Sequence, residues 1–99
     1  MENQMKSNLK AEDFNQLTHR EKLLIIDQEC QSLDSALTYT GDIRYIQIYH
    51  HKNFLVDVLY HLDHREFERI FAFEDISYLE QQYISFRWKF KRIFYSAFQ

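Results

Sequence analysis

The chain has 99 residues, of which 45% are hydrophobic and 17% aromatic, and its formal net charge is −3. These values are typical of a single folded domain over residues 1–99. They exclude an intrinsically disordered chain, and they give the chain as a whole no polyanion-binding signature. A single cysteine, a polar N-terminus and the absence of any long apolar run exclude an internal disulfide, a secretory signal and a membrane-spanning helix. We therefore expect a cytoplasmic protein.

The N-terminal part of the chain predicts one helix. Residues 1–10 are polar, and we expect them to be disordered. Thr18 and Glu21 have the spacing of a capping box, in which each side chain binds the other residue's backbone N–H. They predict a helix over residues 18–33, with an apolar face formed at steps of three and four by Leu23, Ile26, Cys30 and Leu33. Residues 34–42 then form a connector, in which a short strand or an irregular flap fits the pattern, and Thr40-Gly41-Asp42 marks its turn.

Residues 43–73 have the alternating pattern of a three-stranded antiparallel meander, with strands over 43–50, 54–61 and 67–73. A three-residue loop of His51, Lys52 and Asn53 is favoured between the first two strands, because Asn tolerates the left-handed conformation at its last position. This loop pairs Ile46 and Ile48 with valines of the second strand. It predicts one aliphatic face, which would lie against the N-terminal helix.

The other face of the meander carries Tyr45, Tyr49 and Leu59, and it is too apolar to be left fully in water. We expect it to be an outer face that a helix or a partner covers. The alternation of the third strand is ambiguous, because apolar residues occur on both of its sides, so its register stays open.

A long amphipathic helix is predicted over residues 75–98. Asp75 is a favoured N-cap residue, and apolar residues then recur at alternating steps of three and four for three heptads. The predicted fold class is therefore α+β: an N-terminal helix, a three-stranded antiparallel β-meander and a long C-terminal amphipathic helix. That last helix is longer than a small meander needs for cover, which suggests that its distal half meets a second chain.

No stretch has the pattern of a catalytic or cofactor site. The candidates for a metal site are His61, Asp63 and His64, but no H-x-x-x-H or C-x-x-C spacing supports them, and turn residues that happen to be His and Asp explain them better. Cys30 lies on an apolar helix face, where a free cysteine behaves as a small hydrophobe. We therefore predict a non-enzymatic protein that needs no metal or cofactor.

The charges are segregated along the chain. Residues 1–84 hold eight basic and 15 acidic side chains, a net charge of −7, whereas residues 85–99 hold four basic and no acidic ones. The basic patch, Arg87, Lys89, Lys91 and Arg92, alternates with aromatic residues. Three interpretations follow: an interface helix against a partner chain, which we favour, a helix on an anionic membrane surface, and a nucleic-acid contact.

These patterns together predict a small protein–protein interaction module that acts as a homodimer or within a complex. Its contact residues would come from the outer sheet face and from the aromatic C-terminal helix: Tyr45, Tyr49, Leu59, Phe86, Trp88, Phe90, Ile93, Phe94 and Phe98. The alternative is a peripheral binder of anionic membranes or nucleic acid through residues 85–95.

Overall fold

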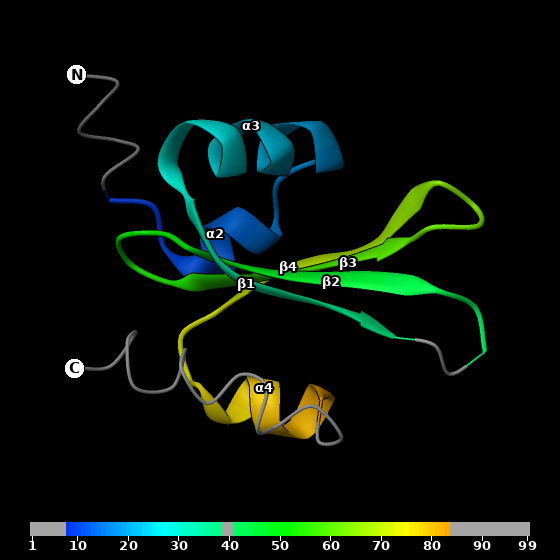
Figure 1. Cartoon of the computed structure of the whole chain (residues 1–99). Helices are drawn as coiled ribbons and strands as arrows, with labels where there is room; N and C mark the ends of the chain where they lie inside the picture. Colours follow the sequence, from blue (N-terminus) through cyan, green and yellow to red (C-terminus); the bar gives the residue numbers. More distant parts are fainter. Residues whose placement is uncertain (1–7, 39–40, 84–99) are drawn as a thin grey trace.

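The computed structural model describes residues 8–38 and 41–83, and all statements about the structure refer to these residues. They form an α+β fold around one antiparallel sheet (Figure 1). The sheet has four strands, not three, and their order in space is their order in the chain. The strands are β1 (Gln31–Thr38), β2 (Arg44–His50), β3 (Leu55–His61) and β4 (Glu66–Phe73).

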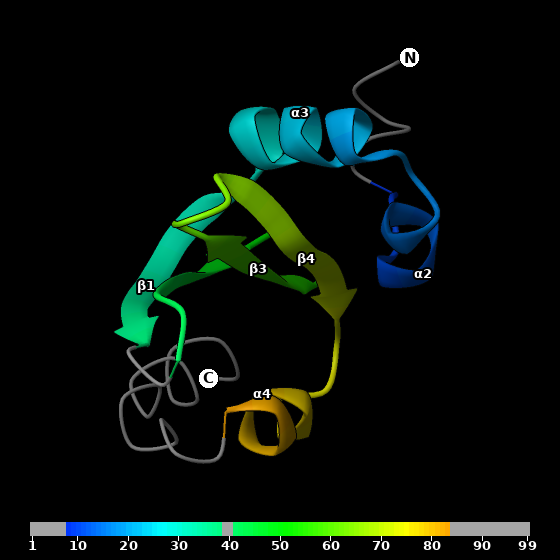
Figure 2. The same cartoon turned by 90° about the vertical axis from the view of Figure 1, so that its right-hand side faces the viewer.

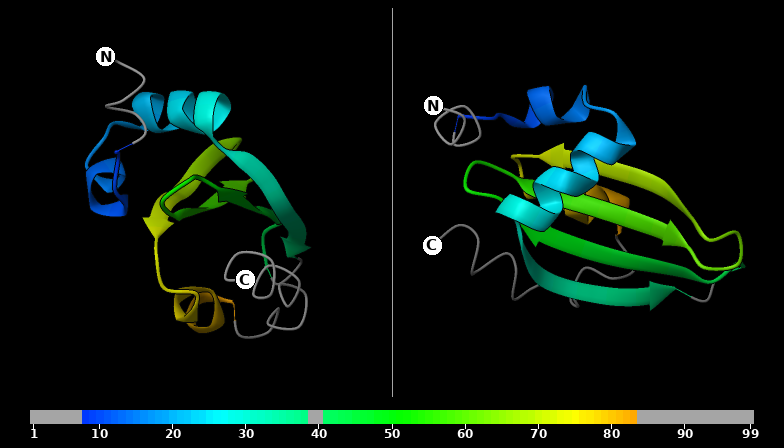
Figure 3. Two further views of the ribbon diagram at one scale, coloured as in Figure 1. Left: turned by 90° about the vertical axis from the view of Figure 1, so that its left-hand side faces the viewer. Right: turned by 90° about the horizontal axis from the view of Figure 1, so that it is seen from above.

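Helices lie on both sides of the sheet (Figures 1 and 2). The short helix α2 (Ala11–Asn15) and the helix α3 (His19–Glu29) lie on one side, and α4 (Ser77–Gln82) lies on the other. We call the side that faces α2 and α3 the upper face and the side that faces α4 the lower face. Seen from above, α3 crosses the strands obliquely (Figure 3).

The predicted start of α3 is confirmed. The Thr18 hydroxyl oxygen accepts a hydrogen bond from the Glu21 N–H at 3.2 Å, and the Glu21 carboxylate accepts one from the Thr18 N–H at 2.9 Å. The predicted end at residue 33 is wrong, because Cys30 already has an extended backbone with φ −110° and ψ 155°. Ser, Asp and Thr dominate the residues that follow and have low helix propensity, so the chain continues as a strand.

That strand, β1, is the element missing from the predicted three-stranded meander. It pairs with β2 along its whole length, with Ala36 opposite Ile46 and Leu37 opposite Tyr45. A bulge between Ser32 and Asp34 interrupts the pairing once. Leu33, which the helical pattern assigned to the face of the N-terminal helix, instead packs against the lower-face core.

The predicted register of β2 and β3 is wrong by one residue. The pairs are Ile48 with Asp57 and Ile46 with Leu59, and the turn is closed by the His51 N–H, which donates to the Phe54 carbonyl at 2.8 Å. Asn53 does not have the positive φ that the three-residue loop requires. Because a shift of one residue moves every side chain to the other face, the predicted aliphatic face does not exist.

The apolar side chains are instead shared between two cores. The upper core joins α2 and α3 to valine, isoleucine and alanine side chains of the sheet: Ala11, Phe14, Ile26, Phe54, Val56, Val58, Ile70 and Ala72. The lower core joins α4 to the opposite side of the same strands: Ile46, Ile48, Leu55, Phe73, Leu79 and Tyr83. Both faces of the sheet are therefore buried near its centre.

The C-terminal helix is shorter than predicted in the part that the structure describes. Asp75, the predicted N-cap residue, lies one position before the N-cap residue Ile76, and its Oδ1 accepts from the Ser77 N–H at 3.0 Å. Helix α4 then ends at Gln82, because Tyr83 has φ −128° and ψ 51°, outside the helical region. The continuous helix is thus interrupted at Tyr83, and the predicted stretch from residue 84 to 98 lies outside the described residues.

Candidate functional site

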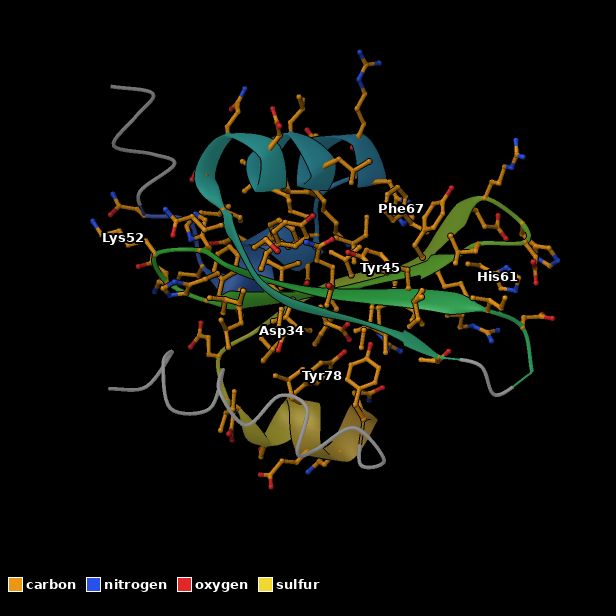
Figure 4. All side chains as sticks on the ribbon, in the orientation of Figure 1. Asp34, Tyr45, Lys52, His61, Phe67 and Tyr78 are labelled. Atoms are coloured by element: carbon orange, nitrogen blue, oxygen red, sulfur yellow. The ribbon has the colours of Figure 1, made fainter. Side chains whose placement is uncertain are left out.

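A row of apolar side chains crosses the upper face near the β3–β4 turn. Leu37 lies opposite Tyr45, Tyr45 lies opposite Tyr60, and Tyr60 lies opposite Phe67. The rings of Tyr60 and Phe67 meet edge to face, with their centroids 4.9 Å apart. One residue from each of the four strands therefore contributes to the row, and Figure 4 shows Tyr45 and Phe67 on the side of the sheet that faces α3.

Ile43 and Leu62 extend this row toward the end of the sheet. The Leu62 N–H donates to the Ile43 carbonyl at 3.1 Å, so the two residues continue the pairing of β2 and β3. The alternation of strand positions assigns them to the upper face, two residues beyond Tyr45 and Tyr60. We call these six residues the distal apolar patch: Leu37, Ile43, Tyr45, Tyr60, Leu62 and Phe67.

The distal apolar patch is partly open to solvent. Leu37, Ile43 and Leu62 are 42%, 36% and 40% exposed, and the three aromatic residues of the patch are half-buried. The upper core lies nearer the other end of the strands, where Phe14 and Ile26 cover Val56 and Ala72. Half of the large hydrophobic residues that are exposed in the described chain thus gather at one end of one face, which is typical of an interaction surface.

A buried polar network lies on the opposite face. The Asp57 carboxylate is fully buried between β3 and α4, and it accepts hydrogen bonds from the Tyr83 hydroxyl at 2.6 Å and the Tyr78 hydroxyl at 2.8 Å. Arg69 donates to Asp57 through Nε at 2.9 Å and to the Tyr83 oxygen at 2.7 Å. Because a buried carboxylate needs a cation and hydrogen-bond donors, this network explains how an aspartate is tolerated in the core.

The network keeps both tyrosines protonated. Burial and the nearby Asp57 carboxylate raise the pKa of Tyr78 and of Tyr83 above the usual value, because each favours the neutral phenol. A neutral hydroxyl can donate to the carboxylate, whereas a phenolate would repel it. The network therefore joins α4 to the sheet through donors, and Tyr78, labelled in Figure 4, points from α4 toward the sheet. The network's hydrogen bonds connect α4 to β3 and β4.

The predicted interface residues do not share one surface. Tyr45 belongs to the distal apolar patch, but Tyr49 packs against the upper core under α3, and Leu59 packs against the lower core. The one-residue register shift is the reason, because it places Leu59 on the face opposite the tyrosines. The other predicted contacts lie outside the described residues: Phe86, Trp88, Phe90, Ile93, Phe94 and Phe98, together with the basic patch of Arg87, Lys89, Lys91 and Arg92.

His61, Asp63 and His64, the candidates for a metal site, lie at the β3–β4 turn. Both ring nitrogens of the buried His61 are engaged: Nδ1 accepts from the His64 N–H at 3.1 Å, and Nε2 lies 3.0 Å from the Asp42 carboxylate. The two imidazole rings stack 4.1 Å apart, while Asp63 is exposed. Within the described residues, no three histidine, cysteine or carboxylate side chains come together as a metal-ligand set. His61 and His64 therefore stabilise the β3–β4 turn.

Several residues of the two sites were missed in the sequence. The sequence pattern assigns Leu37 to the connector and gives Tyr60, Leu62 and Phe67 no functional role, because the patch forms only when all four strands are paired in the correct register. Asp57 and Arg69 were also missed. One signal was present: an aspartate within the apolar run Phe54–Tyr60 needs a buried partner.

Comparison with known proteins finds no matching family model, no matching curated protein and no matching solved structure. Among the helices of the described residues, none has the length and apolarity required to cross a membrane. The function therefore has to be inferred from the surfaces of this chain.

Proposed function

We propose that the protein is a small, non-enzymatic interaction module that self-associates through the distal apolar patch. The observation that carries this proposal is the gathering of Leu37, Ile43 and Leu62, each more than one third exposed, beside three half-buried aromatic rings. Burying such a patch against a second chain removes apolar area from water and uses aromatic side chains, which are common at the centres of interfaces.

The aromatic C-terminal segment is the second part of the proposal. The described residues carry seven basic and 14 acidic side chains, a net charge of −7, while residues 85–99 carry four positive charges. Opposite charges on two parts of one chain favour contact between copies, and Phe86, Phe90 and Phe94 supply the apolar content of that contact. A cytoplasmic homodimer, alone or within a larger complex, is the state that we propose.

Mass measurement tests the proposal. Size-exclusion chromatography with light scattering should show the full chain passing from monomer to dimer between micromolar and millimolar concentration. Replacing Leu37 and Leu62 with serine together should weaken the dimer by about tenfold or more, as expected for two apolar side chains removed from an interface. Replacing Leu23 and Leu24, which are exposed on α3, with serine is the matched control and should leave the dimer unchanged.

The charge segregation also favours a second candidate, a peripheral binder of anionic membranes or nucleic acid through residues 85–95. Sedimentation with vesicles that contain anionic lipid, at low salt, separates this candidate from self-association. Binding that is lost when Arg87, Lys89, Lys91 and Arg92 become glutamine would support it. If no binding occurs at low salt, the second candidate fails.

A further inference from the structure

The two edges of the sheet differ in whether their outward backbone groups are hydrogen-bonded. At the β4 edge, the Asn15 side chain imitates a neighbouring strand: its Nδ2 donates to the Ala72 carbonyl at 2.9 Å, and its Oδ1 accepts from the Ala72 N–H at 2.7 Å. The Lys22 ammonium donates to the Ile70 carbonyl at 3.1 Å. Helices α2 and α3 thus occupy three outward backbone groups of β4, which disfavours the pairing of a further strand there.

The pairing pattern shows which backbone groups point outward at the other edge, β1. In antiparallel strands these groups alternate between the two sides of each strand. Because Ile70 and Ala72 point outward from β4, the alternation carried across β3 and β2 directs Ala36 toward β2 and leaves Ser35 and Leu37 pointing outward. The Ser35 N–H supports this assignment, since it donates to the Asp34 side chain at 2.8 Å instead of to β2.

β1 has few of the features that usually prevent an edge strand from pairing with another chain. Its sequence QSLDSALT contains no Lys, Arg or Pro, which are the residues that most often discourage pairing at an edge. The bulge between Ser32 and Asp34 and the Asp34 carboxylate protect its first half. No described helix or side chain covers the outward groups of Leu37 in the way that Asn15 covers those of Ala72. Among residues 8–38 and 41–83, the second half of β1 is therefore an open edge of the sheet.

We propose that two copies of the chain pair antiparallel through this edge, with the two Ala36 residues facing each other across a two-fold axis. Ser35 of each copy then lies opposite Leu37 of the other. Both residues point outward: each Leu37 N–H donates to a Ser35 carbonyl, and each Ser35 N–H exchanges its Asp34 acceptor for a Leu37 carbonyl. The pairing therefore adds two backbone hydrogen bonds, replaces two side-chain ones and joins the two sheets into one of eight strands. This inference rests on the proposed function, because it assumes that the chain self-associates.

A second copy fits this edge better than an unrelated peptide does. The pairing brings the two Leu37 side chains together as diagonal neighbours on the upper face, so the distal apolar patches of the two copies become continuous. Asp34 is the only charged residue of β1, and the two Asp34 residues lie about 13 Å apart along the strands, which avoids a like-charge contact. A second copy therefore pairs with the edge strand and extends the distal apolar patch at the same time.

Hydrogen exchange of single amides, followed by NMR on the full chain, tests the pairing. The Leu37 N–H points to solvent in one copy and is hydrogen-bonded in the pair, so its exchange should slow by about tenfold or more from micromolar to millimolar concentration. The Ala72 N–H is the internal control, because Asn15 already binds it within one chain and its exchange should not depend on concentration in this way.

Proline substitution supplies a second measurement. Ser35→Pro removes an outward N–H together with its hydrogen bond to Asp34, and it leaves the β1–β2 hydrogen bonds and the distal apolar patch in place. It should therefore weaken the dimer by about tenfold or more. Ser35→Ala, its control, should not weaken the dimer. A dimer in which the Leu37 amide stays unprotected would overturn edge pairing and leave self-association standing. A chain that stays monomeric at millimolar concentration would overturn both, and the exchange data decide the matter if Ser35→Pro does not fold.

Discussion

The Tyr83 hydroxyl donates a 2.6 Å hydrogen bond to the Asp57 carboxylate, across the interface between α4 and the sheet. Tyr83 is also the residue at which the backbone leaves the helix. The same contact therefore joins the last described element to the sheet and coincides with the end of α4.

Replacing Asp57 with alanine should lower the free energy of unfolding by about 3 kcal/mol, because two tyrosine hydroxyls and the Arg69 guanidinium lose their common acceptor in a buried site. Urea unfolding followed by tryptophan fluorescence or circular dichroism measures this change. Asp63→Ala, in the exposed β3–β4 turn, is the control and should change the stability by less than about 0.5 kcal/mol. Equal changes in the free energy of unfolding for the two substitutions would show that the Asp57 network does not stabilise the fold.

Stability should fall steeply in alkaline solution. Burial, followed by the Asp57 carboxylate, raises the pKa of Tyr78 and Tyr83 above the value of about 10 for an unfolded tyrosine. Above about pH 10 the unfolded chain therefore loses protons that the folded chain keeps, and the free energy of unfolding decreases as the pH rises. Below that pH the stabilisation is fully present.

Unfolding measured from about pH 9 to pH 11 checks this expectation. The double variant Tyr78→Phe and Tyr83→Phe should be less stable at neutral pH, but its stability should fall less with rising pH than that of the wild type. Burial also raises the pKa of Cys30, to about 12, but both proteins contain this thiol, so its contribution cancels in the comparison. Parallel pH profiles would contradict the assignment.

Asn15 should be required to protect the β4 edge. Its replacement with alanine removes two hydrogen bonds from the buried Ala72 backbone and should lower the free energy of unfolding by about 2 kcal/mol. Because the freed edge can pair with other chains, the variant should also scatter more light on heating than the wild type. Gln16→Ala, on the neighbouring exposed residue, should do neither, and a similar loss in both variants would argue against the edge role.

Arg65 should be a site where glycine stabilises the protein. Its φ is 54°, the left-handed region in which a side chain is disfavoured, and it lies in the exposed β3–β4 turn. Arg65→Gly should raise the free energy of unfolding by about 0.5–1 kcal/mol. Asp63→Gly, in the same turn but without a positive φ, should give no gain, and thermal unfolding of the two variants distinguishes these outcomes.

The parts of the fold that local chemistry decides were predicted from the sequence. The capping box of Thr18 and Glu21 and the strands around Ile46 and Val58 both depend on neighbouring residues. The boundary after Glu29 was missed because Leu33 continued the helical period by coincidence, while its apolar contacts are made through a strand on the other face. Periodicity alone cannot separate these two origins.

The candidate site was less predictable, because it depends on pairing between distant segments. A change of one residue in the β2–β3 turn separates Leu59 from Tyr45. The pairing of β3 with β4, whose register the sequence leaves open, brings Asp57 beside Arg69. No local pattern records which register the chain adopts, since both turns place apolar residues on both faces. The distal apolar patch forms only when all four strands are paired. The sequence therefore predicts only one of its residues, Tyr45, as a contact residue.

Sedimentation equilibrium of the full chain tests self-association most directly. We predict a mass that rises from that of one chain, 12.3 kDa, toward twice that value between micromolar and millimolar concentration. We also predict that the double substitution of Leu37 and Leu62 by serine shifts this transition to higher concentration. A mass that stays at one chain throughout, or a transition that this double substitution leaves unchanged, would contradict the proposed role of the distal apolar patch.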